Sequence, residues 1–337
     1  MPRTNLLTLL HISDLHFRVS SADDGQPPKW WRHFPATDGW WGHDVRALEH
    51  LEDFVIDLRD ESPYVVLTGD VTACGKVEEF ALAKQFISAS IPTTNRTAGL
   101  YLPDLLARSI SGNHDQWPGS LRVVGKPTAG LGSTMPKLPF TPMTIRLKNG
   151  KRLTLIGIDS DADVFAGGLT RFLARGKFVS QLVALQKQIG PAAADEIRVM
   201  LIHHSPAYDA TRSLAIADNS QAGLREFINQ YGISVLLTGH IHRTVARVTT
   251  AMLDSDRWRV LEARCGTTTQ TDQVPIEWAA EGTIDRRRFP RNTLLVHRLI
   301  ETNSRIEWHT ELYGRYVSGF SKPIPLMKPV TVWPRMI

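Results

Sequence analysis

Strand-like and helix-like segments alternate along roughly the first 240 residues of the chain. Apolar runs typical of buried strands occur at 6–12, 64–68, 106–111, 153–158, 198–202 and 234–238. Between them, apolar residues at three- to four-residue spacing predict helices over 44–60, 77–89, 178–189 and 219–230. Such alternation implies an α/β fold, with a central sheet and helices packed outside it. The pattern then turns to strands alone, at 258–263, 293–299 and 305–312.

Composition places the chain among ordinary globular proteins. Of its 337 residues, 42% are hydrophobic and 22% charged, which excludes disorder because there is enough apolar surface to offset chain entropy. No apolar run approaches the roughly 18–20 residues that span a bilayer, so no membrane partner is expected. Two cysteines, Cys74 and Cys265, cannot build a disulfide framework. Together with an N-terminus that resembles a first strand rather than a signal peptide, they favour a reduced, cytoplasmic location.

The net charge of +5 is local. Residues 281–337 carry ten Lys and Arg against five Asp and Glu, so the remainder of the chain is neutral overall. A basic edge attracts phosphate-bearing partners. However, the chain lacks the dense Lys/Arg track with interleaved aromatic residues that is typical of a nucleic-acid-binding domain. A solvated surface is the simpler interpretation, and a nucleic-acid partner is not favoured.

Five of the predicted strands end in polar clusters. In chain order these clusters are Asp14-Leu15-His16, Gly69-Asp70, Gly112-Asn113-His114-Asp115, His203-His204 and Gly239-His240-Ile241-His242. They contain six of the twelve histidines. Since ligands of open α/β sheets gather where strands end in loops, we expect these side chains to meet at one edge of the sheet.

The residue types in these clusters point to a metal centre. Taken singly, each would be a surface turn or a satisfied core histidine, but burying so many imidazoles and carboxylates together without partners would be too costly. Imidazole with carboxylate and amide oxygens suits Mn, Fe, Zn or Ni. The number of ligands exceeds what one ion needs, so two divalent metal ions are expected. Asp70, alone on its loop, can supply the bridging carboxylate.

The five clusters resemble, in identity and order, the motifs of the calcineurin-like metallophosphoesterases, over about residues 6–245. Within that family, the Gly-Asn-His-Asp motif and the paired histidines are most similar to those of bacterial class III cyclic-nucleotide phosphodiesterases. The resemblance implies a two-sheet β-sandwich flanked by helices, with a dinuclear centre at one edge. The β-rich stretch after residue 245 resembles that family's second sheet.

By position, the resemblance implies a first cation held by Asp14, His16 and His242, and a second held by Asn113, His240 and a histidine after the 198–202 strand, with Asp70 as the bridge. His203 is preferred because it directly follows that strand, and His204 is the alternative. His114 would face the substrate rather than bind metal. Asp115 would fix His114 or its loop.

The expected mechanism follows from these roles. Two dications lower the pKa of a bridging water, so that hydroxide is available near neutral pH to attack phosphorus in line with the leaving oxygen. His114 would donate a proton to that oxygen. The expected substrate is a small phosphoester, with phosphodiesters favoured over phosphoproteins.

A tryptophan-rich insertion over 18–43 directly follows the first candidate ligand motif, Asp14-Leu15-His16. Trp30, Trp31 and Arg32 could stack on a base or another ring of the substrate, and His204 is a further candidate contact. The alternatives are a lid on the protein's own surface or an interface patch, the latter suited to a homodimer.

Asp159, Asp161 and Asp163 are expected as solvated loop residues. The domain division expected is a metallophosphoesterase domain over 1–315, then a proline-rich C-terminal tail over 316–337 that drapes over the surface from Lys322.

Three functional hypotheses compete. A dinuclear metal-dependent phosphodiesterase is favoured. A phosphomonoesterase or a nuclease on the same site is the alternative, and the nuclease requires that the basic residues 286–291 line the cleft. A catalytically silent binding scaffold is disfavoured, because such a protein should have lost ligands and this chain retains the whole set.

Overall fold

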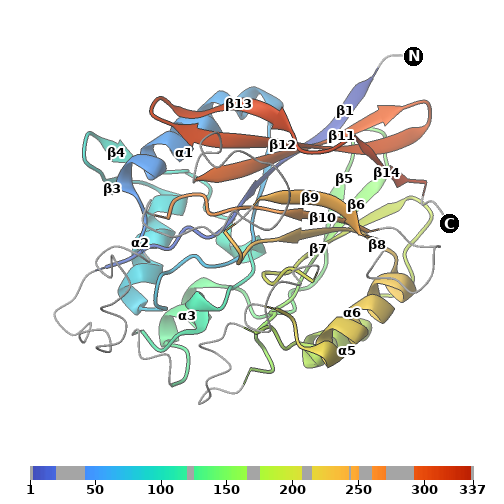
Figure 1. Cartoon of the computed structure of the whole chain (residues 1–337), viewed down its shortest axis with the longest axis horizontal. Coiled ribbons are helices and arrows are strands. Elements are labelled where there is room, and N and C mark those ends of the chain that lie inside the picture. Colours follow the sequence, from blue (N-terminus) through green and yellow to red (C-terminus); the bar gives the residue numbers. More distant parts are fainter. Residues whose placement is uncertain are drawn as a thin grey trace.

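Two mixed β-sheets pack face to face between layers of helices (Figure 1). The computed structural model describes residues 3–19, 42–119, 125–164, 175–206, 215–242, 244–249, 260–270 and 292–334. Within these ranges each large sheet has six strands, and a short hairpin of β3 (Ile91–Pro92) and β4 (Thr97–Ala98) stands apart. The expected two-sheet sandwich flanked by helices is confirmed.

The first sheet has the strand order β13-β12-β11-β1-β2, and β14 also pairs with β12. Its strands are β1 (Thr4–Ile12), β2 (Tyr64–Leu67), β11 (Thr293–Thr302), β12 (Arg305–Tyr316), β13 (Gly319–Pro325) and β14 (Val330–Trp333). β1 is parallel to β2 and antiparallel to β11. β1 therefore joins the N-terminal α/β part of the chain to the C-terminal β meander.

The second sheet has the order β5-β6-β7-β8-β10-β9. Its strands are β5 (Met143–Arg146), β6 (Arg152–Gly157), β7 (Glu196–Leu201), β8 (Ile233–Thr238), β9 (Val245–Thr249) and β10 (Val260–Arg264). β6, β7, β8 and β10 run parallel, so their carboxyl ends lie at the same edge. Every residue of β7 and β8 is buried, as expected for central strands covered on both faces.

Helices cover the outer face of each sheet. The described helices are α1 (Val45–Asp57), α2 (Val77–Ser88), α3 (Ala129–Thr134), α5 (Val179–Gln186) and α6 (Asp218–Tyr231), with single 3₁₀ turns η2 (Arg59–Glu61), η3 (Leu106–Arg108) and η4 (His114–Gln116). α1 begins at the N-cap Asp44, whose carboxylate accepts from two backbone N–H groups of the first turn. α6 ends at Gly232, which takes the left-handed conformation common after a helix.

Three apolar cores separate the layers. Adjacent residues of β1 divide between two of them: Leu9 packs between the sheets, and Leu10 packs under α1 and α2. This two-residue period is that of a strand buried on both faces. The third core lies between the second sheet and helices α5 and α6. No helix of the described ranges is both long and apolar enough to cross a membrane.

The C-terminal segment differs from the expectation. Residues expected to drape over the surface instead form β13 and β14, which pair with β12. The prolines are compatible with this pairing because β13 is an edge strand, where one side of the backbone needs no partner. Trp333 also fastens the segment to the second layer, since its Nε1 donates to Ala194 O at 2.8 Å. The domain boundary at residue 315 stays a prediction.

The expected strand over 106–111 is also wrong for most of its length. Residues 106–108 form the turn η3, and Ile110 alone makes a parallel bridge, to Thr68 after β2. Leu105 and Leu106 both enter the core under the helices, which consecutive strand residues on opposite faces could not do. Ser109 closes the turn by donating to Leu105 O at 2.7 Å.

The core between the sheets gives a stability prediction. We expect Ile197→Ala on β7 to lower the free energy of unfolding by about 2–5 kcal/mol, because Ile197 is fully buried between the sheets and its removal leaves a cavity. Ile56→Ala on α1 is the matched control, since Ile56 is 41% exposed and should change stability by less than about 0.5 kcal/mol. Urea unfolding followed by circular dichroism measures both. Equal losses in the two variants would contradict this packing.

Candidate dinuclear metal centre

The loops that carry the polar clusters converge at one edge of the sandwich. The loop after β1 is hydrogen-bonded to the loop after β2, with Asp14 N donating to Gly69 O and His16 N to Asp70 O, both at 3.0 Å. In the second sheet, Gly239 N donates to His203 O at 3.0 Å. Parallel strands thus deliver their carboxyl-terminal residues to a common point, as expected for a ligand site of an open sheet.

A threonine segment after β10, residues 267–269, connects the two sheets at this edge. Thr267 Oγ1 donates to Asp14 O at 2.9 Å, and Thr269 Oγ1 donates to Leu15 O at 2.7 Å. Between them, Thr268 exchanges hydrogen bonds with the backbone of Ser13. These contacts fix the first ligand loop against the second sheet. This segment was not predicted from the sequence.

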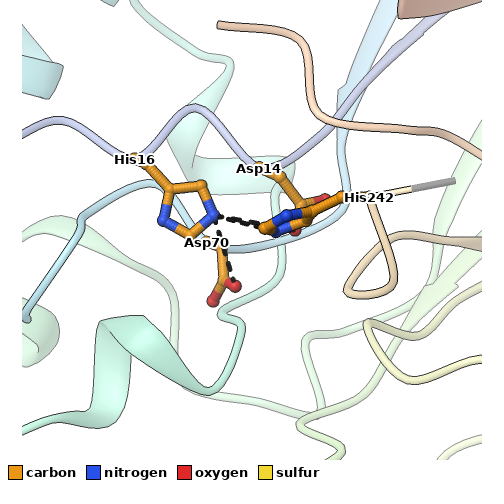
Figure 2. Close-up of side chains that lie close together, drawn as sticks. All are labelled: Asp14, His16, Asp70 and His242. Atoms are coloured by element: carbon orange, nitrogen blue, oxygen red, sulfur yellow. Dashed lines mark hydrogen bonds and ion pairs between the residues drawn. The ribbon is translucent and has the colours of Figure 1, made fainter. Parts of the chain in front are cut away.

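The first group of candidate ligands comprises Asp14, His16, Asp70 and His242 (Figure 2). One donor atom from each lies within 4.8 Å of all the others. His242 Nε2 is 3.2 Å from Asp14 Oδ1 and 3.2 Å from His16 Nε2, and His16 Nε2 is 3.8 Å from Asp70 Oδ2. Carboxylate oxygens and imidazole nitrogens therefore point toward a common centre.

The second group comprises Asp70, His203 and His240, and Asn113 joins it through its amide oxygen. His203 Nε2 is 3.3 Å from Asp70 Oδ2. Asn113 Oδ1 is 3.3 Å from His203 Nε2 and 3.0 Å from His240 Nδ1. Asp70 is the residue common to both groups, so its carboxylate lies between them.

The residues present fit two divalent cations. All of these side chains are buried except that of His242, which is 13% exposed. Asp14 Oδ1 accepts no hydrogen bond from the part of the chain that the structure describes, although buried polar atoms usually have such a partner. Two imidazole nitrogens, His16 Nε2 and His242 Nε2, face one another. Both could bind the same cation through their lone pairs. The nitrogen and oxygen donors suit several first-row metals and do not select one.

The electrostatics of the site centre on Asp70. Burial alone would raise the pKa of its carboxyl group, but the surrounding imidazoles of His203, His114 and His16 outweigh burial and hold that pKa well below its usual range. For His203, burial lowers the pKa, and the opposing attraction of Asp70 raises it to about 10. Burial lowers the pKa of His16 and of His240 well below the usual value. The Asp70 carboxylate is therefore ionised near neutral pH, and its negative charge attracts positive charge to this point of the site.

The backbone at the candidate ligands is strained. Asp14, His16, Asp70, His240 and His242 all have positive φ, between 50° and 71°. Residues other than glycine adopt this conformation at a cost of order 1–3 kcal/mol each, and such residues cluster at functional sites. The left-handed turns direct side chains from different loops to one point. In extended backbone, successive side chains would point to opposite faces of the sheets.

Glycines precede three of the ligands because there is no space for a side chain. A Cβ on Gly112, before Asn113, would overlap the Asp70 carboxylate, and a Cβ on Gly239, before His240, would overlap Ser13 Oγ. These two contacts explain the Gly-Asn and Gly-His pairs of the motifs in steric terms.

The two adjacent histidines after β7 have different environments. His203 Nδ1 donates to Thr68 O at 2.7 Å, which fixes the tautomer and leaves Nε2 directed at Asp70. His204 Nδ1 instead lies 2.7 Å from Ser160 Oγ, and its ring packs on that of His240 with centroids 4.0 Å apart. His203 therefore lies among the candidate ligands, whereas His204 contacts Ser160 and the ring of His240.

His114 lies beside the first group, not within it. Its Nδ1–H donates to Ala73 O at 2.8 Å, and its ring meets the His16 ring edge-on with centroids 4.8 Å apart. Burial lowers the pKa of His114. The indole of Trp117 stacks on its face, with centroids 4.1 Å apart. The sequence analysis missed Trp117, although an aromatic residue three positions after His114 was the available signal.

Asp115 holds the loop rather than the His114 ring. Its carboxylate accepts from Thr72 N at 2.8 Å, Gly112 N at 2.9 Å and Val71 N at 3.2 Å. Burial, together with the nearby Asp70, raises the pKa of Asp115 to about 7. These bonds join the loop after β2 to the Gly-Asn-His-Asp turn.

The remaining residues that the sequence predicted for the site differ in whether the structure describes them. Trp30, Trp31 and Arg32 lie outside the described residues, as do the basic residues 286–291, so their proposed contacts stay predictions. Arg18 N donates to His43 Nδ1 at 3.2 Å, which brings the two flanks of residues 20–41 together near the site.

The expectation of solvated aspartates after β6 is wrong for Asp161. It is buried, and its Oδ2 lies 3.7 Å from His204 Nδ1. The reason is that the chain after β6 folds back against the loop after β7, where Ser160 already contacts His204. Asp163 is exposed, as expected, and accepts from Ser180 N at 2.9 Å.

A family model of calcineurin-like phosphoesterases matches residues 7–244. No curated protein sequence matches the chain.

Among solved structures, the chain is similar to GAP50, the anchor in the inner membrane complex of Plasmodium (14% identity, 96% of this chain and 89% of that chain, TM-score 0.49). It is also similar to a dimetal phosphatase from Danio rerio (11% identity, 98% and 99%, TM-score 0.49). A third is Vps29 from Entamoeba histolytica, solved with zinc (11% identity, 95% and 100%, TM-score 0.32).

The family match covers all five ligand loops and most of the chain. The chain therefore belongs to the calcineurin-like phosphoesterase family.

Proposed function

We propose that the chain hydrolyses a small organic phosphodiester of nucleotide-like character, with water as the nucleophile. The observation that supports this most is that Asp70 belongs to both groups of candidate ligands, Asp14, His16 and His242 on one side and His203 and His240 on the other. One buried carboxylate shared by two donor sets is the arrangement that a pair of cations requires. The preference for a diester rests on the resemblance of the Gly-Asn-His-Asp and paired-histidine motifs to those of cyclic-nucleotide phosphodiesterases.

When bound, two divalent cations (Mn, Fe, Zn or Ni) would supply Lewis acidity for the phosphate oxygens and a lowered pKa for the attacking water. The residues of the chain hold this arrangement in place. Asp70 is common to the two groups of candidate ligands. Asp14 and His242 belong to the first group, and Asn113 and His240 belong to the second. The fixed left-handed turns keep these donors oriented before substrate arrives, so little reorganisation is needed during the reaction.

His114 is the proposed proton donor. Hydrolysis forms a bond from the water oxygen to phosphorus and breaks the bond to the leaving oxygen, which keeps the electron pair. Because Nδ1–H is bound to Ala73 O, Nε2 must take up the transferable proton, and the negative charge of Asp70 and of a bound phosphoester opposes burial and favours the protonated ring. Proton donation by Nε2 neutralises the leaving oxygen, and the proton lost by the attacking water passes to solvent, from which His114 is protonated again.

The two cysteines bear on the compartment. Cys74 and Cys265 are both thiols, and thiols rather than disulfides are typical of proteins in a reducing compartment. We propose a cytoplasmic location on this ground. A homodimer and a substrate contact through Trp30, Trp31 and Arg32 stay parts of the proposal.

A metal-dependent assay tests the function. Purified protein loaded with Mn, Fe, Zn or Ni is given bis-p-nitrophenyl phosphate and p-nitrophenyl phosphate. We expect a chelator-sensitive reaction that is faster on the diester. A faster reaction on the monoester would favour a phosphatase, and salt-sensitive cleavage of single-stranded DNA or RNA would favour a nuclease. No hydrolysis with any of the four metals would overturn the proposal.

Asp70→Ala tests the shared carboxylate. We expect this variant to lose both cations, because each group of ligands loses a donor and the repulsion between two adjacent dications is no longer offset. Elemental analysis by mass spectrometry after loading and desalting gives the stoichiometry. Asp195→Ala, at an exposed ion pair with Arg152, is the control and should retain two ions. Two ions retained by Asp70→Ala would show that Asp70 does not bridge.

His114→Ala tests the proton donor. We expect unchanged metal content and turnover lowered by about 10²–10⁴, the usual contribution of a positioned acid or base. Metal analysis and steady-state kinetics on the same preparation check both. Loss of metal in this variant would place His114 among the ligands instead.

A further inference from the structure

Trp117 and His114 form a stacked pair at the edge of the candidate centre. Their ring centroids are 4.1 Å apart, and the ring planes differ by 26°. Both residues belong to the turn that contains η4, where Trp117 N donates to His114 O at 3.1 Å. In a 3₁₀ turn, side chains three positions apart eclipse one another, so the backbone itself brings the indole over the imidazole.

Two further contacts define the orientation of the His114 ring. Ala73 O accepts from Nδ1 at 2.8 Å, which fixes one edge of the ring. The His16 ring meets it nearly at right angles, with centroids 4.8 Å apart and planes at 85°. A single hydrogen bond to a carbonyl still allows the imidazole to tilt about that bond. The indole face removes this tilt, because a flat surface in contact with the ring sets its plane.

Trp117 is itself held firmly. It is only 3% exposed and packs with Ala73 and Cys74 in a small apolar cluster of their own. The adjacent Gly75 has positive φ, and a Cβ there would overlap the carbonyl oxygen of Trp117. Glycine is therefore needed at position 75, because the turn carrying the stacked pair lies directly on it.

We infer that Trp117 is a positioning residue, whose stack holds the His114 imidazole in the orientation that delivers a proton to the leaving oxygen. This inference rests on the proposed function, in which His114 is the proton donor. A positioned acid matters most when the leaving oxygen is strongly basic, because such an oxygen leaves poorly without a proton. Loss of the stack should therefore alter the dependence of the rate on the leaving group.

The test compares Trp117→Met, which removes the ring and retains much of the volume, with Trp117→Phe, which retains a ring. The substrates are methyl phenyl phosphate, with a basic leaving oxygen, and methyl p-nitrophenyl phosphate, whose leaving oxygen needs little protonation. For Trp117→Met we expect kcat on the phenyl ester to fall by about 10- to 100-fold, and kcat on the nitrophenyl ester by less than about threefold. KM should stay unchanged, and Trp117→Phe should behave almost as the wild type.

Trp308→Met is the matched control. Trp308 is also a buried tryptophan, 1% exposed, but it lies in the core between the sheets. We expect it to lower stability without changing the ratio of the two rates. Equal slowing of both esters in Trp117→Met, or full activity on both, would overturn the inference. A wild-type protein that hydrolyses neither ester would instead refute the proposed function.

A spectroscopic signature checks the stack without any change at Trp117. In zinc-loaded wild-type protein, the indole ring current should move the His114 ring protons upfield of their positions in a free histidine. Their signals are assigned by their disappearance in His114→Ala. Trp117→Phe should retain a smaller upfield shift. Unshifted signals in the wild type would show that the rings are not stacked in solution, and the inference would fail even if Trp117→Met did not fold.

Discussion

The shared carboxylate of Asp70 is the constraint on which the site and much of the fold depend. It lies in the loop after β2 of the first sheet, whereas His203 and His240 lie in the loops after β7 and β8 of the second. The carboxylate can serve both groups of ligands only if the two sheets meet at this edge. Packing between the sheets provides that proximity, and the hydrogen bond from His114 N to Asp70 Oδ1, at 2.9 Å, orients the carboxylate.

The strained backbone at the candidate ligands is tolerated because neighbouring contacts hold the loops in this conformation. The ligand loops follow strands that are almost completely buried, so each loop starts from a fixed position. The threonine segment 267–269 then ties the loop after β1 to the second sheet, and Asp115 ties the loop after β2 to the Gly-Asn-His-Asp turn. The free energy of these contacts and of the cores offsets left-handed backbone at Asp14, Asp70 and His240. The same loops bring Trp117 over His114, so the scaffold of the metal ligands also orients the proposed acid.

The strands, the helices and the candidate ligands could be predicted from short segments, because strands and helices have their own periodicity and because imidazole and carboxylate at strand ends have few other uses. The two-sheet sandwich followed only from the resemblance to the calcineurin-like metallophosphoesterases. What it missed depends on contacts between distant segments. The burial of Asp161 comes from the neighbouring loop after β7, and the clamp of residues 267–269 comes from a strand about 250 residues after β1. The pairing of β13 with β12 was missed because prolines suggested an irregular tail, although an edge strand accepts them.

Anomalous X-ray diffraction from crystals of the manganese-loaded protein tests the central claim most directly. The account predicts two anomalous peaks about 3.5–4 Å apart, on opposite sides of the Asp70 carboxylate, one near His16 and His242 and the other near His203 and His240. A single peak, two peaks on the same side of Asp70, or no peak among these side chains would contradict it.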